Sequence, residues 1–199
     1  TAGDFTTAPE MSSLFGATLA KQVAQVLVVT GGDVLEFGAG SGKLAGDLIR
    51  ALQKIGCEPR QYLILEPSPD LRERQNSFLQ KEIPEWISRV QWIDQLPKKF
   101  SGVMIANEVL DAMPIDLVWW QLDGIHERGV AISGDDFKWA DRMLAPGSLL
   151  DHVKNISVSP GYVSEIHRAG AAFIRSVGDS LKHGAALLID YGFLDHEYY

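Results

Sequence analysis

The chain alternates short apolar runs with amphipathic segments, and this alternation predicts strands and helices in turn. The predicted core strands are residues 34–37, 62–66, 90–94, 102–107 and 185–191. Between them, apolar residues recur three or four positions apart, as at Leu44, Leu48, Ile49 and Leu52, which is typical of a helix with one buried face. Strands that alternate with helices favour an α/β fold with a parallel sheet and helices on both faces.

Capping residues predict where the helices begin and end. Residues 7–10, Thr-Ala-Pro-Glu, have the pattern of a capping box and predict a helix that ends at Gly31. Two prolines precede a predicted polar helix over 70–81. Ser159-Pro160 predicts the start of a long helix over 159–182, with Ser as the N-cap and Pro at the first position.

The pattern changes after residue 115. Three short β runs, 117–122, 128–132 and 137–139, are separated by Asp-Gly and Gly-Asp turns, which predicts a small antiparallel insertion. We expect a single domain over 1–199. Its parts are an N-terminal helical segment (1–30), a ligand-binding core (33–114), the β insertion (115–145), and a helix with the fifth core strand (159–192).

Composition narrows the classes of protein. The 199 residues are 46% hydrophobic and 22% charged, as in ordinary globular proteins, and no apolar run approaches the ~20 residues of a transmembrane helix. The net charge of −8 argues against nucleic-acid binding. A single cysteine, Cys57, excludes an intramolecular disulfide and fits a reducing compartment. The five histidines show no metal-ligand spacing, so no metal site is expected.

The strongest motif is Glu36-Phe-Gly38-Ala-Gly40-Ser-Gly42, between a predicted strand and a predicted helix. Glycines let the backbone turn sharply and approach a ligand closely. The next strand ends in Glu66, and a carboxylate there can accept both hydroxyls of a ribose. A nicotinamide-binding oxidoreductase is one alternative, but its fingerprint is Gly-x-Gly-x-x-Gly, and here the spacing is Gly-x-Gly-x-Gly.

A second group of polar residues follows the fourth predicted strand, in Asn107-Glu108-Val-Leu-Asp111. This position lies at the carboxyl edge of the sheet, where open α/β sheets bind ligands. One interpretation is helix capping by Asn107 with acids in the first turn. The other, which we favour, is a functional pair of carboxylates on one helix face.

Four segments together resemble the MidA family. They are residues 3–12 (GDFTTAPEMS), 35–45 (LEFGAGSGKLA), 107–114 (NEVLDAMP) and 188–192 (LIDYG). The resemblance implies a Rossmann-like class I methyltransferase fold with a doubly wound, mostly parallel sheet, and S-adenosylmethionine as cofactor. The residues that it implies for cofactor binding are Glu36, Gly38, Ala39, Gly40, Gly42, Leu44, Glu66, Asp94 and Asn107. Asp94 would face the adenine amino group, although it is equally well explained as a loop carboxylate.

The mitochondrial member of that family is a protein arginine methyltransferase needed for respiratory complex I assembly. The resemblance therefore implies a protein partner that carries the target arginine, with Glu108 and then Asp111 as the residues that hold its guanidinium. Thr7, Glu10 and Tyr191 are further substrate candidates, Tyr191 being equally well explained as a core residue. The alternative to catalysis is an assembly factor that retains the cofactor pocket.

The resemblance also bears on location and length. It implies the cytoplasm for a bacterial protein and the mitochondrial matrix for a eukaryotic one, and it leaves the oligomeric state open. Family chains are longer at both ends, so the final strands of the sheet are expected to be missing from this chain. We therefore expect the native protein to continue past Tyr199, or another chain to cover the edge of the fifth strand.

Overall fold

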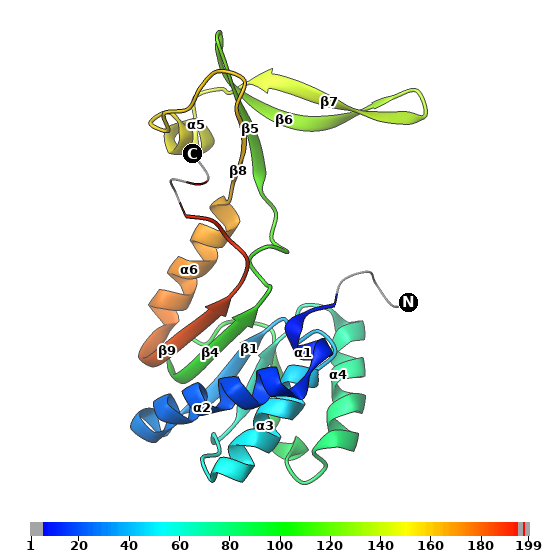
Figure 1. The fold of residues 1–199 in the computed structure, drawn as a ribbon, viewed down its shortest axis with the longest axis vertical. Helices are drawn as coiled ribbons and strands as arrows, with labels where there is room; N and C mark the ends of the chain where they lie inside the picture. The colour runs from blue at the N-terminus through cyan, green and yellow to red at the C-terminus, as the bar shows by residue number, and fades with distance from the viewer. Residues whose placement is uncertain (1–5, 195–196, 198–199) are drawn as a thin grey trace. The chain divides into compact units, whose positions relative to one another are not determined.

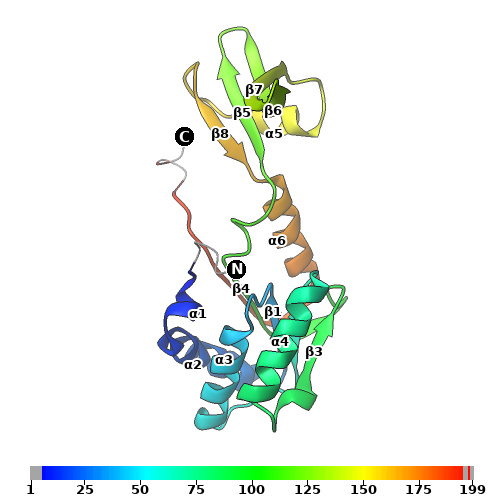
Figure 2. The ribbon, with the colours of Figure 1, turned by 90° about the vertical axis from the view of Figure 1, so that its right-hand side faces the viewer.

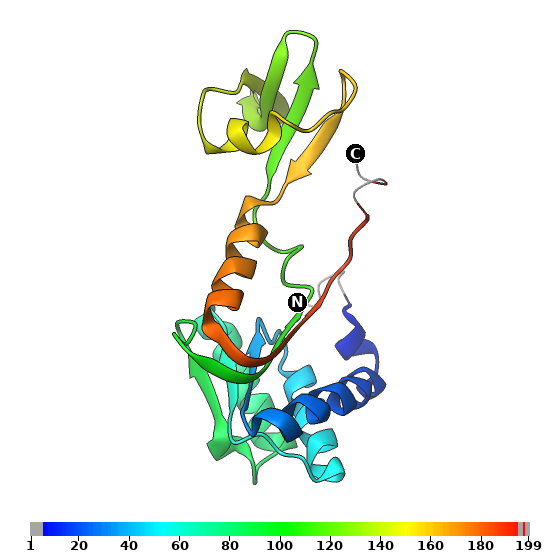
Figure 3. The same ribbon diagram turned by 90° about the vertical axis from the view of Figure 1, so that its left-hand side faces the viewer.

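Five parallel strands in the order β3-β2-β1-β4-β9 form the first of two sheets in the computed structural model, which describes residues 6–194 and 197. These strands are β1 (Asp33–Phe37), β2 (Tyr62–Leu65), β3 (Val90–Ile93), β4 (Phe100–Asn107) and β9 (Leu181–Ile189). β1 lies at the centre, with β2 on one side and β4 on the other. β9 pairs with β4 and lies at the edge of the described sheet (Figure 3).

Three longer helices lie on one side of this sheet (Figures 1 and 2). The helices of this part of the chain are α1 (Ala8–Met11), α2 (Ser13–Thr30), α3 (Lys43–Ile55), α4 (Pro69–Glu82) and the short 3-10 helix η1 (Ile87–Arg89). The chain moves from β1 to β2 to β3 in one direction across the sheet. Right-handed crossovers therefore place α3 and α4 on the same face, and α2 packs beside α3.

The core of this unit forms where those helices meet the sheet. Leu44, Leu48, Ile49 and Leu52 of α3 are all buried, as their spacing predicts. By length and composition α2 alone among the described helices is apolar enough to span a bilayer, a test that core helices of soluble proteins also pass. Its buried residues contribute to the same hydrophobic cluster as α3.

The antiparallel sheet belongs to a second compact unit, Ala112–Phe173 with the residues from Tyr191 onward. Its strands pair in the order β7-β6-β5-β8 and are β5 (Asp116–Gln121), β6 (Gly124–Ser133), β7 (Asp136–Met143) and β8 (Val163–Ile166). With α5 (Ser148–Val153) they enclose a small core around Val118, Trp120 and Val153. The expected antiparallel insertion is thus present, and the sheet gains a strand beyond the predicted bounds of 115–145.

The prediction of a long helix over 159–182 is wrong. Gly161 adopts a left-handed conformation (φ 94°) and turns the chain, and β8 then pairs with β5. The helix, α6, covers only Arg168–Ser180. Pairing with a neighbouring strand has overridden the local Ser-Pro signal, which is a common outcome for short segments.

The predicted capping box at residues 7–10 is also wrong. The Thr7 side chain makes no capping hydrogen bond, and the helix breaks after Met11 because Ser12 is extended. Ser12 instead caps α2 by accepting a hydrogen bond from the backbone N–H of Leu14. The fold class itself, an α/β fold with a parallel Rossmann-like sheet, is confirmed.

Gly102 is a sensitive point of the sheet. A Cβ added there would lie 1.9 Å from the carbonyl oxygen of Asp33, and the backbone has a φ of +133°. We expect Gly102→Ala to lower the free energy of unfolding by about 2–4 kcal/mol, measured by chemical denaturation. Gly178, exposed in α6 with nothing within 4 Å of its added Cβ, is the control. Gly178→Ala should raise stability by up to about 1 kcal/mol, and equal effects of the two changes would contradict the packing argument.

Candidate functional site

A cavity lies at the carboxyl ends of β1 and β4. The chain leaves β1 toward β2 and leaves β4 toward β9, in opposite directions across the sheet, so this point is a topological switch point. The cavity has a volume of about 190 Å³. Its lining residues are Thr7, Pro9, Glu10, Glu36, Gly38, Ala39, Gly40, Leu44, Asn107 and Glu108.

The glycine-rich loop forms one wall. Gly38, Gly40 and Gly42 have φ values of 59°, 53° and 86°, which residues with a side chain rarely adopt. The loop is tied down by two backbone hydrogen bonds, from Gly38 N–H to the carbonyl of Leu65 and from Gly42 N–H to the carbonyl of Ala39. An added Cβ at Gly40 would meet nothing within 4 Å, so the backbone conformation, not crowding within the protein, requires glycine there.

Three carboxylates face this one cavity, and they come from three separate segments. Glu10 lies in α1, Glu36 in β1 and Glu108 after β4. None of the ten described lining residues carries a basic side chain. The cavity is therefore suited to a cationic ligand.

Glu36 is almost fully buried, with 3% of its surface exposed. Its Oε2 accepts a hydrogen bond from the hydroxyl of Tyr62 at 2.7 Å. Burial raises the pKa of Glu36 to about 7, the bond from Tyr62 opposes this shift, and the nearby charge of Glu66 adds to it. Glu36 thus lies close to half-ionised at neutral pH.

Glu66 is equally buried and is held by two donors. Its Oε1 accepts from the backbone N–H of Ser68 at 3.0 Å, and its Oε2 accepts from the side-chain amide of Gln75 at 3.2 Å. Gln75 was not identified by the sequence reasoning. Gln75 is four residues from both Leu71 and Leu79, so it lies in the apolar stripe of an otherwise polar helix. An amide at such a position was the available sign of a buried polar role.

The loop after β4 is held in an unusual conformation. Glu108 has a positive φ of 50°, and its backbone N–H donates to the carbonyl of Ile189 at 2.8 Å. The carboxylate of Asp190 accepts from the backbone N–H groups of Leu110 at 2.9 Å and Asp111 at 3.3 Å. Residues 108–115 are not helical, so the helix-capping interpretation is wrong, and so is the helix face on which the functional pair of Glu108 and Asp111 was expected. Asp190 is a second residue that the sequence did not identify.

The predicted site residues do not all meet at the cavity. Six of the nine predicted cofactor residues line it, from the glycine loop, Leu44 and the ends of β1 and β4, but Gly42, Glu66 and Asp94 do not. Asp94 is exposed and forms an ion pair with Arg72 at 2.7 Å. Asp111 is exposed beside the Glu108 loop. Tyr191 belongs to the second unit and is 87% exposed, so the alternative of a core tyrosine is wrong.

α1 and its N-cap residue contribute Thr7, Pro9 and Glu10 to the cavity wall, which brings two of the predicted substrate residues to it. The hydroxyl of Ser41 donates to the carboxylate of Glu10, and this bond ties α1 to the glycine-rich loop. Glu10 is thus held beside the glycine-rich loop by its contact with Ser41.

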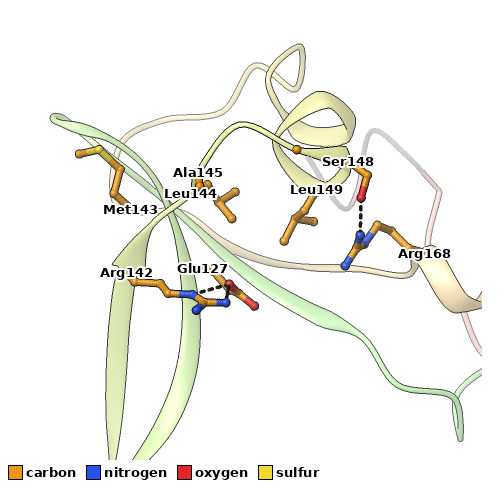
Figure 4. Close-up of a pocket in the computed structure, with 9 residues that line it drawn as sticks. Glu127, Arg142, Met143, Leu144, Ala145, Ser148, Leu149 and Arg168 are labelled. Atoms are coloured by element: carbon orange, nitrogen blue, oxygen red, sulfur yellow. Dashed lines mark hydrogen bonds and ion pairs between the residues drawn. The ribbon is translucent and has the colours of Figure 1, made fainter.

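A second cavity, of about 390 Å³, lies within the antiparallel unit (Figure 4). Its charged side chains are already paired. Arg142 contacts Glu127 at 2.7 Å, and Arg168 donates to Ser148 at 2.9 Å and to Asp116 at 2.6 Å. This cavity is larger than the first, but each charged side chain in its described lining has a partner, so no free charge directs a ligand to it. The residues of the glycine-rich motif do not line it.

Comparison with known proteins identifies the family of this chain. The family model "Putative S-adenosyl-L-methionine-dependent methyltransferase" matches residues 18–199. A protein from Burkholderia thailandensis crystallised with S-adenosyl-homocysteine is 48% identical, with a TM-score of 0.92 over 99% of this chain and 51% of that one.

Curated relatives are more distant. A mitochondrial protein arginine methyltransferase, NDUFAF7, from Xenopus laevis is 30% identical over 96% of this chain and 50% of its own length. The human protein of that name is 27% identical over 96% of this chain and 49% of its own. The chain thus spans about half the length of these relatives.

The residues present fit S-adenosylmethionine. Its ammonium and sulfonium groups are cationic, and the cavity offers three carboxylates with no basic side chain in its wall. The glycine-rich loop, whose glycines have positive φ values, borders the same cavity, so its backbone can approach the ligand closely. The match to S-adenosylmethionine-dependent proteins also decides against nicotinamide as the cofactor.

The raised pKa of Glu36 predicts a loss of stability as the pH rises from about 4.5 to about 7. In the unfolded chain this carboxyl ionises near its ordinary value of 4.5, and in the folded protein near about 7. Its contribution to stability is therefore fully present below the unfolded pKa and is lost as pH rises through the folded one, by about 3 kcal/mol in total.

Glu36→Gln removes this titration and keeps an acceptor for Tyr62. The free energy of unfolding of each protein is measured by urea denaturation at several pH values between about pH 5 and about pH 9. Over this range the variant should lose about 3 kcal/mol less stability than wild type loses. Glu85→Gln, a change at an exposed position, should follow wild type. Parallel pH curves for all three proteins would refute the assignment.

Proposed function

We propose that this chain, which belongs to that family of S-adenosylmethionine-dependent methyltransferases, methylates an arginine side chain of a protein. The observation that carries the proposal is the cavity at the switch point, into which Glu10, Glu36 and Glu108 bring carboxylates and no lining residue brings a cation. A guanidinium remains charged at any physiological pH, so an acidic cavity favours it over a neutral amine or hydroxyl.

The glycine-rich loop and two buried acids are proposed to hold the cofactor. Glu36 lies where a carboxylate can pair with the ammonium group. Glu66 retains acceptor capacity for two ribose hydroxyls, because a carboxylate has about four lone-pair sites and the protein donates one hydrogen bond to each of its oxygens. When bound, the cofactor supplies a methyl group on an electrophilic sulfonium.

Glu108 is the proposed guanidinium clamp. A carboxylate binds a guanidinium through two parallel hydrogen bonds, which fixes the orientation of the attacking nitrogen. It also draws positive charge toward one nitrogen and leaves the other a better nucleophile. Three backbone N–H groups of the loop donate hydrogen bonds, one to the carbonyl of Ile189 and two to the carboxylate of Asp190. These bonds hold Glu108 at its unusual positive φ. Alignment of the reacting groups is expected to supply much of the remaining rate.

The acidic cavity favours a cationic side chain, which both arginine and lysine have at neutral pH, so the choice of arginine over lysine rests on the relatives. The NDUFAF7 proteins of Xenopus laevis and human are protein arginine methyltransferases by name. The test is transfer of a labelled methyl group from S-adenosylmethionine to arginine-containing and lysine-containing peptides of matched sequence. Label on arginine alone is the expected result, and label on lysine alone would refute the proposal.

Glu108→Gln is the sharpest test of the clamp. The change keeps the size of the side chain and some hydrogen bonding but deletes the charge. Methyl transfer should fall by ~100-fold or more, because a charged interaction in a cleft is lost. Binding of S-adenosyl-homocysteine, measured by calorimetry, should change by less than about threefold, since little cofactor energy depends on this residue.

Glu85→Gln serves again as the control and should transfer normally. If Glu108→Gln transfers at the wild-type rate, the clamp is wrong and Asp111 is the next residue to test. If wild type binds S-adenosyl-homocysteine but methylates no peptide or protein, the assembly-factor alternative gains support.

Glu66→Ala tests the cofactor side of the proposal. Removing the ribose acceptor should weaken S-adenosyl-homocysteine binding by about 1.5–3 kcal/mol, the usual worth of hydrogen bonds to a charged group. Calorimetry at constant pH measures this directly. If the affinity for S-adenosyl-homocysteine is unchanged, Glu66 is not the residue that binds the ribose.

A further inference from the structure

We propose that Gln75 of α4 is the positioning residue of the cofactor site, because its one side chain fixes both the glycine-rich loop and Glu66. The inference rests on the proposed role of Glu66 as the ribose acceptor. It adds a residue that contributes no atom to the cavity wall and acts through the groups that do.

The amide of Gln75 is fully buried and makes three hydrogen bonds to three different segments. Its Nε2 donates to the carbonyl of Gly40 at 2.9 Å and to Oε2 of Glu66 at 3.2 Å. Its Oε1 accepts from the indole N–H of Trp92 at 2.8 Å. The glycine-rich loop and the ends of β2 and β3 therefore meet at one side chain.

The partners determine which way the amide points. An indole N–H can only donate, so Trp92 requires the oxygen of Gln75 on its side. The two donor hydrogens then face the carbonyl of Gly40 and the carboxylate of Glu66, both of which are acceptors. All three contacts are consistent with this one orientation.

Arg72, one helical turn earlier on α4, supports the same arrangement. Its guanidinium donates to the carbonyl of Glu66 and, at 3.1 Å, to the carbonyl of Ile93. It also pairs with Asp94. Arg72 thus fixes the backbone at the ends of β2 and β3, whereas Gln75 fixes the Glu66 side chain and the glycine loop.

A carboxylate in place of this amide would fail in a specific way. It could still accept from Trp92, but it would turn an acceptor toward Glu66 and toward the carbonyl of Gly40. Among the three described hydrogen-bond partners of this side chain, Glu66 alone is ionisable. Protonation of the new carboxyl at low pH would restore a donor and relieve the repulsion between the two acids.

The experiment measures S-adenosyl-homocysteine binding by calorimetry for wild type, Gln75→Glu and Gln75→Leu at about pH 5.5 and about pH 8. We expect both variants to bind roughly 10- to 100-fold more weakly than wild type at the higher pH, the effect of losing one or two buried hydrogen bonds. Relative to wild type, Gln75→Glu should recover much of its affinity at the lower pH, and Gln75→Leu should not.

Two further variants keep the test decisive. Gln80→Glu makes the same change at an exposed position of α4 and should bind as wild type does at both pH values. Trp92→Phe removes the donor that orients the amide and keeps an aromatic ring, and it should weaken binding a few-fold even if the Gln75 variants fail to fold.

Unchanged affinity in the Gln75 and Trp92 variants would overturn the inference. So would a loss in Gln75→Glu that is the same at both pH values and accompanied by a matching fall in melting temperature, because that result indicates packing alone. Binding is measured without a protein substrate, so a failure to find arginine methylation would leave this result intact.

Discussion

The parallel pairing of β1 with β4 is the interaction on which the site depends. In this register Phe37 lies beside Ala106, so the glycine-rich loop and the Glu108 loop start one strand spacing apart. The chain turns away from these strands in opposite directions, which leaves their carboxyl ends free of a crossover helix. Residues 70 positions apart in the sequence thereby share one small cavity.

The same pairing concentrates negative charge in a place where water is scarce. Buried carboxylates are costly unless donors or cations compensate them. Tyr62 compensates Glu36 in part, and Ser68 and Gln75 compensate Glu66. The negative charge that these donors do not compensate is available to a cationic ligand. The empty site is therefore less stable than a core of neutral residues would be. Such a conflict between stability and binding is typical of functional sites.

The parts of the fold that could be predicted from the sequence are those with strong local signals. The apolar strands, the amphipathic pattern of α3 and the turn at Gly38–Gly42 each depend on neighbours a few residues away. The segment over 159–182 could not be predicted in this way, since β8 exists only because β5 is beside it. For the same reason the partners of Gln75 and Asp190, which lie in distant segments, have no signature in their flanking residues. The contact between Glu10 and Ser41 likewise joins segments 31 residues apart and has no local signature.

The loop that carries Glu108 has a consequence for how the protein folds. The backbone N–H of Leu110 in this loop is paired by Asp190, 80 residues further along the chain, and the whole antiparallel sheet lies between the two in the sequence. Closing a flexible loop of that length costs about 4 kcal/mol of chain entropy, and contacts between distant residues form slowly. If the intervening unit folds first, it shortens the effective loop and lowers that cost. The rate at which the molecule completes the candidate site is then set by a part of the chain that contributes no residue to the cavity.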